Sequence, residues 1–200
     1  MNCLTGHGQT TDAVHDAGVS RELAQLRNQE IKDLRYDLRF SIPRDKHALV
    51  TGEGRFRFRL DAPTEIVIDF REAKDKIAEV GVNGKTAAYT FRNEHIVLPA
   101  ALTQAGENAI SVRFTAGDQS LNRNDDYLYS LSVPDRARTI FPCFDQPNLK
   151  AVFTLMLELP AEWVGVSNTR VTKEEKRADR KTLHFAPTRP LSTYLFAFAA

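Results

Sequence analysis

Apolar and polar residues alternate through much of this chain, as they do in strands that bury one face and expose the other to water. The alternation runs through residues 34–42 and 55–60 and returns at 108–114, while 151–159 is a longer apolar segment. Arginine fills the polar positions of 55–60, and the period of two indicates that these side chains cover the solvent face of an antiparallel strand. We therefore interpret this arginine run as an exposed sheet face rather than as a basic binding patch.

Turn-forming residues separate the strand-like segments. Asn83-Gly84 precedes the segment 85–91, and this dipeptide favours a hairpin because a type I′ turn needs positive φ at both central residues. Residues 95–98 predict a further short strand, with His95 at an exposed position. Many short strands with turn signals between them predict an all-β fold, a multi-stranded antiparallel β-sandwich or saddle.

The first residues lack apolar periodicity and precede a single helical segment. Residues 1–18 are polar and predict a flexible leader, in which His7 and His15 are solvated, and residues 19–200 then form one β-domain. Ser20 is suited to cap a short N-terminal helix, because its hydroxyl can accept a hydrogen bond from the first turn. The apolar residues that follow at helical spacing are Leu23, Leu26 and Ile31.

The composition is that of a globular protein without a strong electrostatic field. The chain has 200 residues, of which 42% are hydrophobic and 26% are charged, and its formal net charge is +1. This balance gives no long-range attraction to nucleic acid or to an anionic membrane, and no apolar run is long enough to span a bilayer. We expect neither partner. The polar leader is compatible with export to the periplasm or cell envelope, although no complete signal peptide is visible.

Cysteine and histidine are too sparse to build a metal site or a disulfide framework. Cys143 is expected to be a buried free thiol, and a bridge to Cys3 is the alternative. No two of the five histidines stand four residues apart, so the helical pair of a zinc site is missing. The polar loop 117–126 lacks the regular acidic spacing of a calcium loop. We expect no metal in these residues.

One stretch of the chain resembles a known family. Its residues, in order, are Arg138, Phe141-Pro142-Cys143-Phe144-Asp145-Gln146-Pro147, Lys150-Ala151 and Phe153. This order closely resembles the R-x-x-F-P-C-x-D-E-P-x-x-K-A-x-F signature of aminopeptidase N-type zinc metallopeptidases, with Gln146 in place of the usual Glu. Segments 166–168 and 185–198 also resemble the family, so the resemblance covers about residues 30–200.

The physical content of this signature is structural. Pro142 and Pro147 fix backbone angles and remove two N–H donors, and Asp145 between them can accept backbone hydrogen bonds that lock the turn. Neither Cys143 nor its sequence neighbours supply a nucleophile with a base. The residues that we expect to have this structural role are Arg138, Pro142, Cys143, Asp145, Pro147 and Lys150.

The resemblance implies an N-terminal β-domain that caps the catalytic domain of a zinc aminopeptidase, an enzyme that removes N-terminal residues from peptides. In this family the catalytic domain carries G-x-M-E-N and H-E-x-x-H motifs, which hold the substrate amine and the zinc, and neither occurs in residues 1–200. These residues alone are expected to bind no cofactor and to hydrolyse nothing. Zinc is expected in the parent enzyme, and the implied partners are the catalytic domain of the same chain and a peptide substrate.

The resemblance also points to residues that line the substrate cleft. The family places a Gln, followed two residues later by Glu or Gln, ahead of the Phe-Pro-Cys segment, and the matching positions here are Leu131 and Val133. Their side chains cannot accept a hydrogen bond from an ammonium group, whereas a register shifted by one residue offers Ser130 and Ser132. The cleft candidates are therefore Ser130, Leu131, Ser132 and Val133.

Two other functions stay open. A secreted binding module for carbohydrate or protein predicts an exposed aromatic row, which the single Trp163 does not supply. A non-enzymatic scaffold of the same family, as in general transcription machinery, would have lost the zinc motifs. Residues 194–200 are almost wholly apolar, and because domains seldom end within such a segment, we expect the chain to continue beyond Ala200. An exposed apolar face for a catalytic domain would favour the enzyme.

Overall fold

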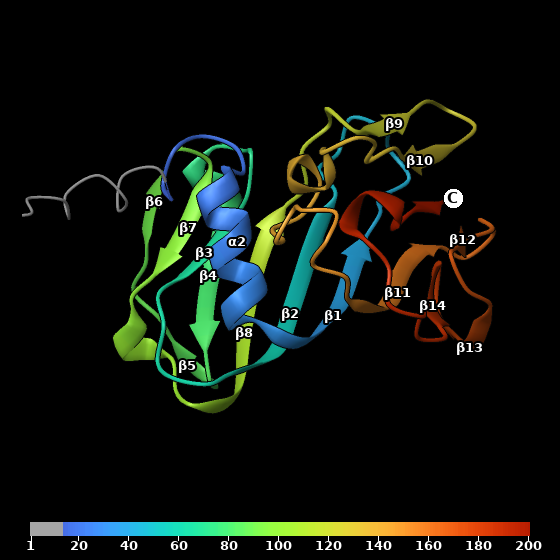
Figure 1. The fold of residues 1–200 in the computed structure, drawn as a ribbon. Coiled ribbons are helices and arrows are strands. Elements are labelled where there is room, and N and C mark those ends of the chain that lie inside the picture. The colour runs from blue at the N-terminus through green and yellow to red at the C-terminus, as the bar shows by residue number, and fades with distance from the viewer. Residues whose placement is uncertain (1–13) are drawn as a thin grey trace, which may run out of the picture.

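A large mixed β-sheet forms the body of the protein in the computed structural model, which describes residues 14–200 (Figure 1). Its eight strands lie in the order β13-β14-β11-β1-β2-β8-β4-β5. They are β1 (Lys32–Ser41), β2 (Thr51–Leu60), β4 (Ile77–Val82), β5 (Lys85–Thr86), β8 (Gly106–Thr115), β11 (Val152–Pro160), β13 (Val171–Arg177) and β14 (Arg180–Phe185). Among the described residues, β1 and β11 form the one parallel pair, so the predicted antiparallel sheet is mixed at this point.

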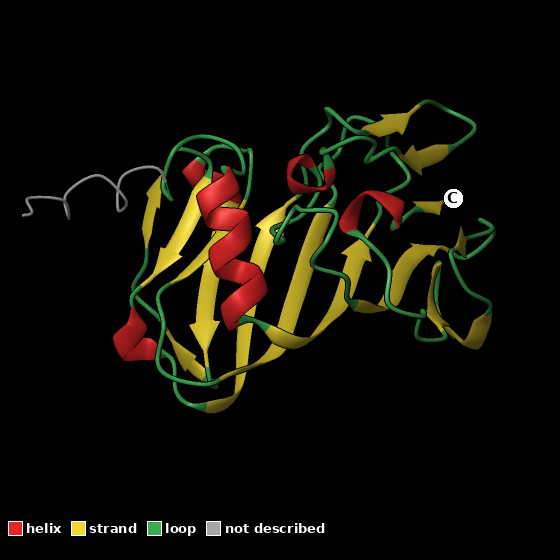
Figure 2. Cartoon of the chain, viewed as in Figure 1, coloured by secondary structure: helices red, strands yellow, loops and turns green. Residues whose placement is uncertain are grey.

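Two smaller sheets, one α-helix and four short 3-10 turns complete the described chain (Figure 2). One sheet has the order β12-β15-β10-β9, with β9 (Leu121–Arg123), β10 (Leu128–Ser130), β12 (Val166–Ser167) and β15 (Phe198–Ala199). The other has the order β3-β7-β6, with β3 (Ile66–Asp69), β6 (Thr90–Arg92) and β7 (His95–Leu98). The turns are η1 (Lys74–Lys76), η2 (Ala100–Leu102), η3 (Ala137–Thr139) and η4 (Thr193–Leu195). The all-β prediction is confirmed.

The predicted hairpin at Asn83-Gly84 is confirmed, but the strand after it is shorter than expected. Asn83 has a φ of 50° and Gly84 a φ of 81°, and the turn joins β4 to β5. The segment 85–91, predicted as one strand, instead contributes β5 to the large sheet and the start of β6 to the three-stranded sheet. The alternating pattern cannot reveal such a change of sheet, because both halves keep the same period.

The main core lies between the inner face of the eight-stranded sheet and the smaller sheets. Aromatic side chains cross this space: the ring centroid of Phe40 on β1 lies 4.8 Å from that of Phe198 on β15, and Phe114 on β8 lies 5.9 Å from Phe70 after β3. Aromatic pairs at such distances add stability beyond the apolar area that they bury. The arginines of β2 point the other way, into solvent, as the alternation predicts.

The predicted N-terminal helix is α2 (Arg21–Glu30), and it covers the side of the three-stranded sheet that faces away from the main core (Figure 1). Ser20 caps it, since its Oγ accepts a hydrogen bond of 3.0 Å from the backbone N–H of Leu23. Leu23 then packs against Val67 and Val97 in a small apolar cluster. The helix is therefore held by packing as well as by its cap.

Two histidine predictions from the sequence differ from the structure. His95 was expected at an exposed position, and this was wrong: it is fully buried, because β7 is the middle strand of its sheet and both faces are covered. His15 was expected to be solvated, but its ring nitrogen lies 2.6 Å from a carboxylate oxygen of Glu65. His7 and Cys3 lie outside the described residues, and the division into a leader and a domain stays a prediction.

Candidate functional site

The signature residues form a mostly buried segment that fastens separate parts of the fold together. Asp145 is at its centre: Oδ2 accepts a hydrogen bond of 3.1 Å from the backbone N–H of Arg138, and Oδ1 accepts one of 2.6 Å from the Thr193 hydroxyl. Burial raises the pKa of Asp145 above its usual range, although these two hydrogen bonds oppose the shift. The expected locking of the turn by Asp145 is therefore present.

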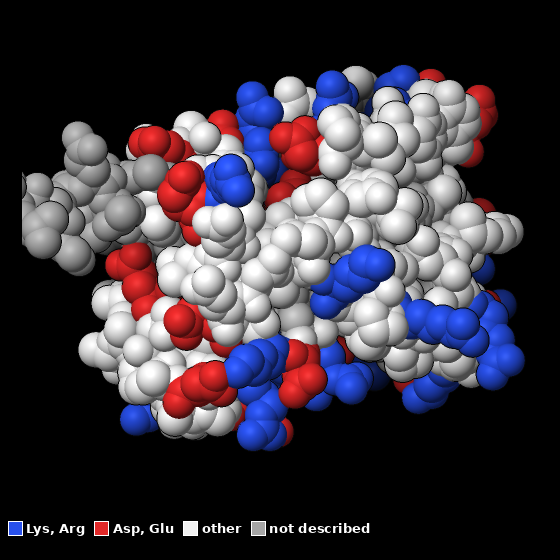
Figure 3. All heavy atoms as spheres, in the orientation of Figure 1, with Lys and Arg blue, Asp and Glu red and all other residues white. Residues whose placement is uncertain are grey.

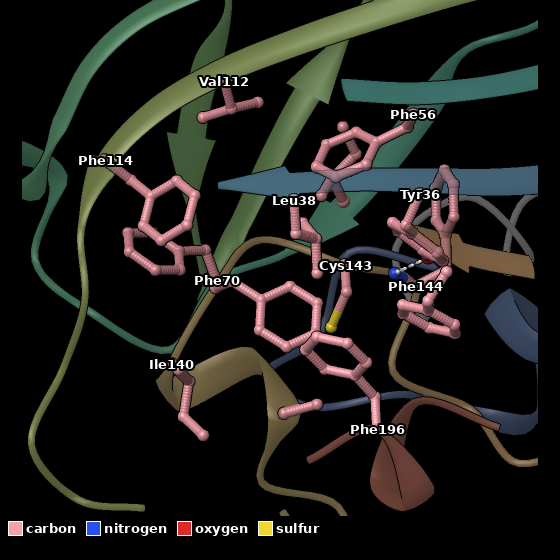
Figure 4. Packing of buried hydrophobic residues seen from close by; sticks show 14 of the residues in the cluster. Tyr36, Leu38, Phe56, Phe70, Val112, Phe114, Ile140, Cys143, Phe144 and Phe196 are labelled. Carbon is pink, nitrogen blue, oxygen red and sulfur yellow. Dashed lines mark hydrogen bonds between the residues drawn. The ribbon is translucent and has the colours of Figure 1, made fainter. Parts of the chain in front are cut away.

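Cys143 is a buried free thiol, as predicted. Its backbone exchanges two hydrogen bonds with Asp69, of 2.8 and 3.0 Å, and its sulfur lies among aromatic rings that include Phe70 and Phe196 (Figure 4). Burial, followed by the nearby Asp145 and Asp69 carboxylates, raises the pKa of the thiol well above its usual value. A thiol in this setting is unreactive, because the thiolate is the nucleophilic form.

Asp69 connects the signature segment to helix α2 through a buried ion pair. The two Arg27 guanidinium nitrogens Nη1 and Nη2 donate to its carboxylate at 2.8 and 2.6 Å, and the backbone N–H of Asp145 donates at 2.8 Å. His95 Nδ1 lies 3.0 Å away, while its Nε2 is 2.8 Å from the carbonyl oxygen of Asp16. Burial alone would raise the pKa of Asp69, but Arg27 and His95 hold it below its usual range.

Sequence reasoning missed this network. Arg27 and Asp69 are 42 positions apart, and each occupies a place where a charged residue is normally solvated. The signal that was available is the polar Asp69 at the end of the otherwise apolar β3. A buried charge at such a position requires a partner.

The other signature residues divide between buried and exposed positions. Arg138 is buried, and its Nη2 donates to Asp135 at 3.2 Å, whereas Pro142 is enclosed. Pro147 and Lys150 are exposed, and the Pro147 carbonyl accepts a hydrogen bond of 2.6 Å from the Ser192 hydroxyl. The signature therefore supports the fold, and none of these groups is arranged for catalysis.

The four cleft candidates alternate between the interior and the surface. Ser130 and Ser132 are buried, whereas Leu131 and Val133 are each 50% exposed. The Ser130 hydroxyl both accepts from the backbone N–H of Phe198 at 2.9 Å and donates to its carbonyl at 3.3 Å, so it is occupied within the fold. The side chains that this segment offers to a neighbouring molecule are therefore those of Leu131 and Val133.

Leu131 and Val133 continue an exposed apolar face on the four-stranded sheet. Tyr129 on β10 and Val166 on β12 both pair with Ala199 on β15, so they lie in one row across the sheet. The exposed members of this face are Tyr127, Tyr129, Leu131, Val133, Val166 and Leu195. Over η4 and the C-terminal residues Figure 3 shows mostly uncharged surface, whereas charged side chains gather elsewhere on the molecule. Such a contiguous apolar face marks a site of contact with another protein surface.

The described residues do not offer ligands for a metal ion. Within residues 14–200 no group of three or more His, Cys, Asp or Glu side chains is arranged to hold one. The described part of the chain also contains no helix that is long and apolar enough to cross a membrane. We therefore derive no chemical step at zinc from this chain.

A comparison with protein families identifies the chain. The profile of the peptidase M1 N-terminal domain matches residues 32–195. The chain belongs to this family. The match covers the eight-stranded sheet, the signature segment and the four cleft candidates.

Curated relatives of this M1 N-terminal domain are aminopeptidases. Probable M1 family aminopeptidase 1 of Encephalitozoon cuniculi is 31% identical over 154 residues, which cover 68% of this chain and 18% of that protein. Human glutamyl aminopeptidase is 46% identical over 67 residues, or 33% of this chain and 7% of that enzyme. The chain thus spans less than a quarter of the length of these relatives.

Solved structures show the same fold. The M1 zinc metallopeptidase of Deinococcus radiodurans has a TM-score of 0.72 and 21% identity, covering 86% of this chain and 42% of that one. A mutant of the same enzyme with a bound Tyr-Ser-Ala substrate has a TM-score of 0.71 and 22% identity, covering 85% and 42%. At this identity the similarity establishes the fold of the M1 N-terminal domain.

Proposed function

We propose that this M1 N-terminal domain caps the catalytic domain of a zinc-dependent aminopeptidase and forms one wall of its peptide cleft. The observation that carries the proposal is the apolar face of the four-stranded sheet, which Tyr129, Leu131 and Val133 share with Val166 and Leu195. A face of this kind loses contact with water when a second domain covers it, and this burial stabilises the joined state.

Residues 130–133 are proposed as the part of the wall nearest the substrate. Leu131 and Val133 point outward from the same segment, so they offer an apolar surface to the first residue of a peptide. Neither side chain can accept a hydrogen bond from the substrate ammonium. The amine must then be held by groups of the catalytic domain, and this wall would act on the side chain of the first residue.

Zinc is proposed for the parent enzyme rather than for this domain. In an aminopeptidase the metal polarises the scissile carbonyl and activates the attacking water. The contribution of residues 14–200 would be to bind the peptide and to exclude solvent from one side of the cleft.

The test uses the full-length protein and an aminoacyl-p-nitroanilide substrate. We expect hydrolysis that a chelator abolishes and that added zinc restores. Tyr129→Asp and Val166→Asp should expose the domain boundary to limited proteolysis and lower the activity at least about tenfold, because each places a charge in an apolar contact. Ala88→Asp adds the same charge at an exposed position in the segment between β5 and β6 and should change neither readout.

The scaffold alternative gives a different outcome in the same test. A scaffold would show the protease sensitivity of Tyr129→Asp without any zinc-dependent hydrolysis in the parent chain. Unchanged proteolysis of both face variants would instead contradict the docking of a domain on this face.

A further inference from the structure

The outward face of the eight-stranded sheet has two halves with different charge patterns. In one half cations lie beside carboxylates: Arg39 is 3.1 Å from Glu158, and Arg113 is 3.1 Å from Glu79. The other half is hollowed into a groove of about 880 Å³. Its cationic lining residues are Arg35, Arg55, Arg57, Arg59 and Lys150, and its carboxylate lining residues are Asp33 and Glu107. The groove therefore has an excess of positive charge that the rest of the face lacks.

The strand register places like charges directly opposite each other in this groove. Arg35 on β1 pairs with Arg57 on β2, and Lys32 pairs with Arg59. Like charges at such positions destabilise a sheet. Asp37 binds Arg57 at 2.8 Å. Across residues 14–200 no carboxylate forms an ion pair with Arg35, Arg55 or Arg59, so most of the repulsion is not relieved within the described chain.

The spacing of these guanidinium groups suits a ligand with several tetrahedral oxyanions. Arg55, Arg57 and Arg59 are alternate residues of one strand, so their Cα atoms repeat about every 7 Å, and Arg35 lies on the neighbouring strand about 5 Å away. Each guanidinium presents a planar fork that matches phosphate. A tetrahedral phosphate also has more free oxygens than a carboxylate, so it can bridge the forks of both strands.

We propose that this groove binds a small ligand that carries at least two phosphate groups. Its volume lies in the range of small-molecule sites. Leu34 and Phe58 also line it, so they offer apolar contact to the organic part of a phosphate ester. None of the cleft candidates Ser130, Leu131, Ser132 or Val133 lines the groove, so the ligand does not compete with a peptide for this surface.

The experiment titrates pyrophosphate into the full-length protein by calorimetry at constant ionic strength. We expect saturable binding at one site, and at least about a tenfold loss of affinity in the double variant with Arg35→Gln and Arg59→Gln, since two charge-assisted contacts disappear. The matched control combines Arg39→Gln with Arg113→Gln, which removes the same charge from the neutral half of the face. Its affinity should stay within about twofold of the unchanged protein.

Four results would overturn the proposal. They are the absence of saturable binding, an equal loss of affinity in the control, equal affinity for citrate as a carboxylate probe, and binding to vesicles of anionic phospholipid without binding to free pyrophosphate. Because both double variants keep their strand positions exposed, far-UV circular dichroism should show them folded. A folded groove variant that keeps full affinity would also contradict the assignment. Zinc-dependent peptide hydrolysis is measured separately, so either proposal can fail without the other.

Discussion

Replacing Asp69 by asparagine should remove a large part of the stability of this domain. The substitution keeps the shape of the side chain but not its charge, and it turns one acceptor oxygen into an N–H donor. Arg27 is only 3% exposed, and after the change its guanidinium keeps one neutral acceptor, the Val67 carbonyl at 2.7 Å. Breaking a buried pair by removing one partner costs about 3–5 kcal/mol. Small domains have a total stability of about 5–15 kcal/mol, so the loss should be plain.

The assay is urea denaturation at pH 7, followed by the fluorescence of Trp163. Asp37→Asn is the matched control, because Asp37 binds Arg57 at 2.8 Å on the exposed sheet face, where such pairs contribute about 0–1 kcal/mol. Adding Arg27→Met to Asp69→Asn should restore part of the loss, since the unpaired buried cation disappears. A loss from Asp69→Asn below about 1 kcal/mol, or equal to that of the control, would refute the reasoning.

The same variant predicts a dependence on pH. Arg27 and His95 hold the pKa of Asp69 below its usual range against the effect of burial. A lowered pKa in the folded state stabilises the fold above the unfolded value, and this stabilisation is lost as the pH falls through the folded value. The difference in unfolding free energy between the unchanged protein and Asp69→Asn should therefore be constant near neutrality and shrink below about pH 4. A difference that stays the same at pH 3 would contradict the assigned charge.

Three further predictions test the packing. Tyr36→Phe should lower the unfolding free energy by about 1–3 kcal/mol, because the Tyr36 hydroxyl accepts a hydrogen bond of 2.9 Å from a buried backbone N–H; a loss below about 0.5 kcal/mol would contradict it. Gly117→Ala should cost at least about 1–3 kcal/mol, since its Cβ would lie 2.4 Å from a backbone carbonyl oxygen, whereas Gly165→Ala meets the ends of flexible leucine side chains and should cost less in the same urea titration. In a chain whose other cysteine is replaced by serine, Cys143 should react with a thiol reagent only when urea unfolds the protein, and rapid labelling of the native state would show that its burial is wrong.

The local elements of this fold were predictable from the sequence, because each depends on neighbouring residues. The alternation in β2, the Ser20 cap and the Asn83-Gly84 turn are all present. The partner of a strand is another matter. A period of two shows which side chains share a face, but it does not identify the neighbouring strand. The parallel pairing of β1 with β11 and the burial of His95 therefore had no local signal.

The candidate site was predictable to a similar extent. The signature located the buried turn around Cys143 and Asp145, and both have the structural positions that were expected. Two registers were left open for the cleft segment, and the structure turns Leu131 outward and Ser130 inward. The hydrogen bonds between Ser130 and Phe198 fix this choice, and they join residues 68 positions apart. Pairing between distant residues carries the information that the pattern along the chain lacks. The assignment of these residues to a substrate cleft stays a prediction.

The parallel contact between β1 and β11 has a consequence for the order in which the protein can be made. A ribosome releases β1, β2 and β8 long before β11, yet Arg35 must pair with Val152. Until then, the outer edge of β1 keeps its backbone N–H and C=O groups unpaired, and such an edge is a template for pairing with other chains. Contacts between residues so far apart also slow folding. The nascent chain therefore has a vulnerable interval that ends only when the strand after the signature segment emerges and covers this edge.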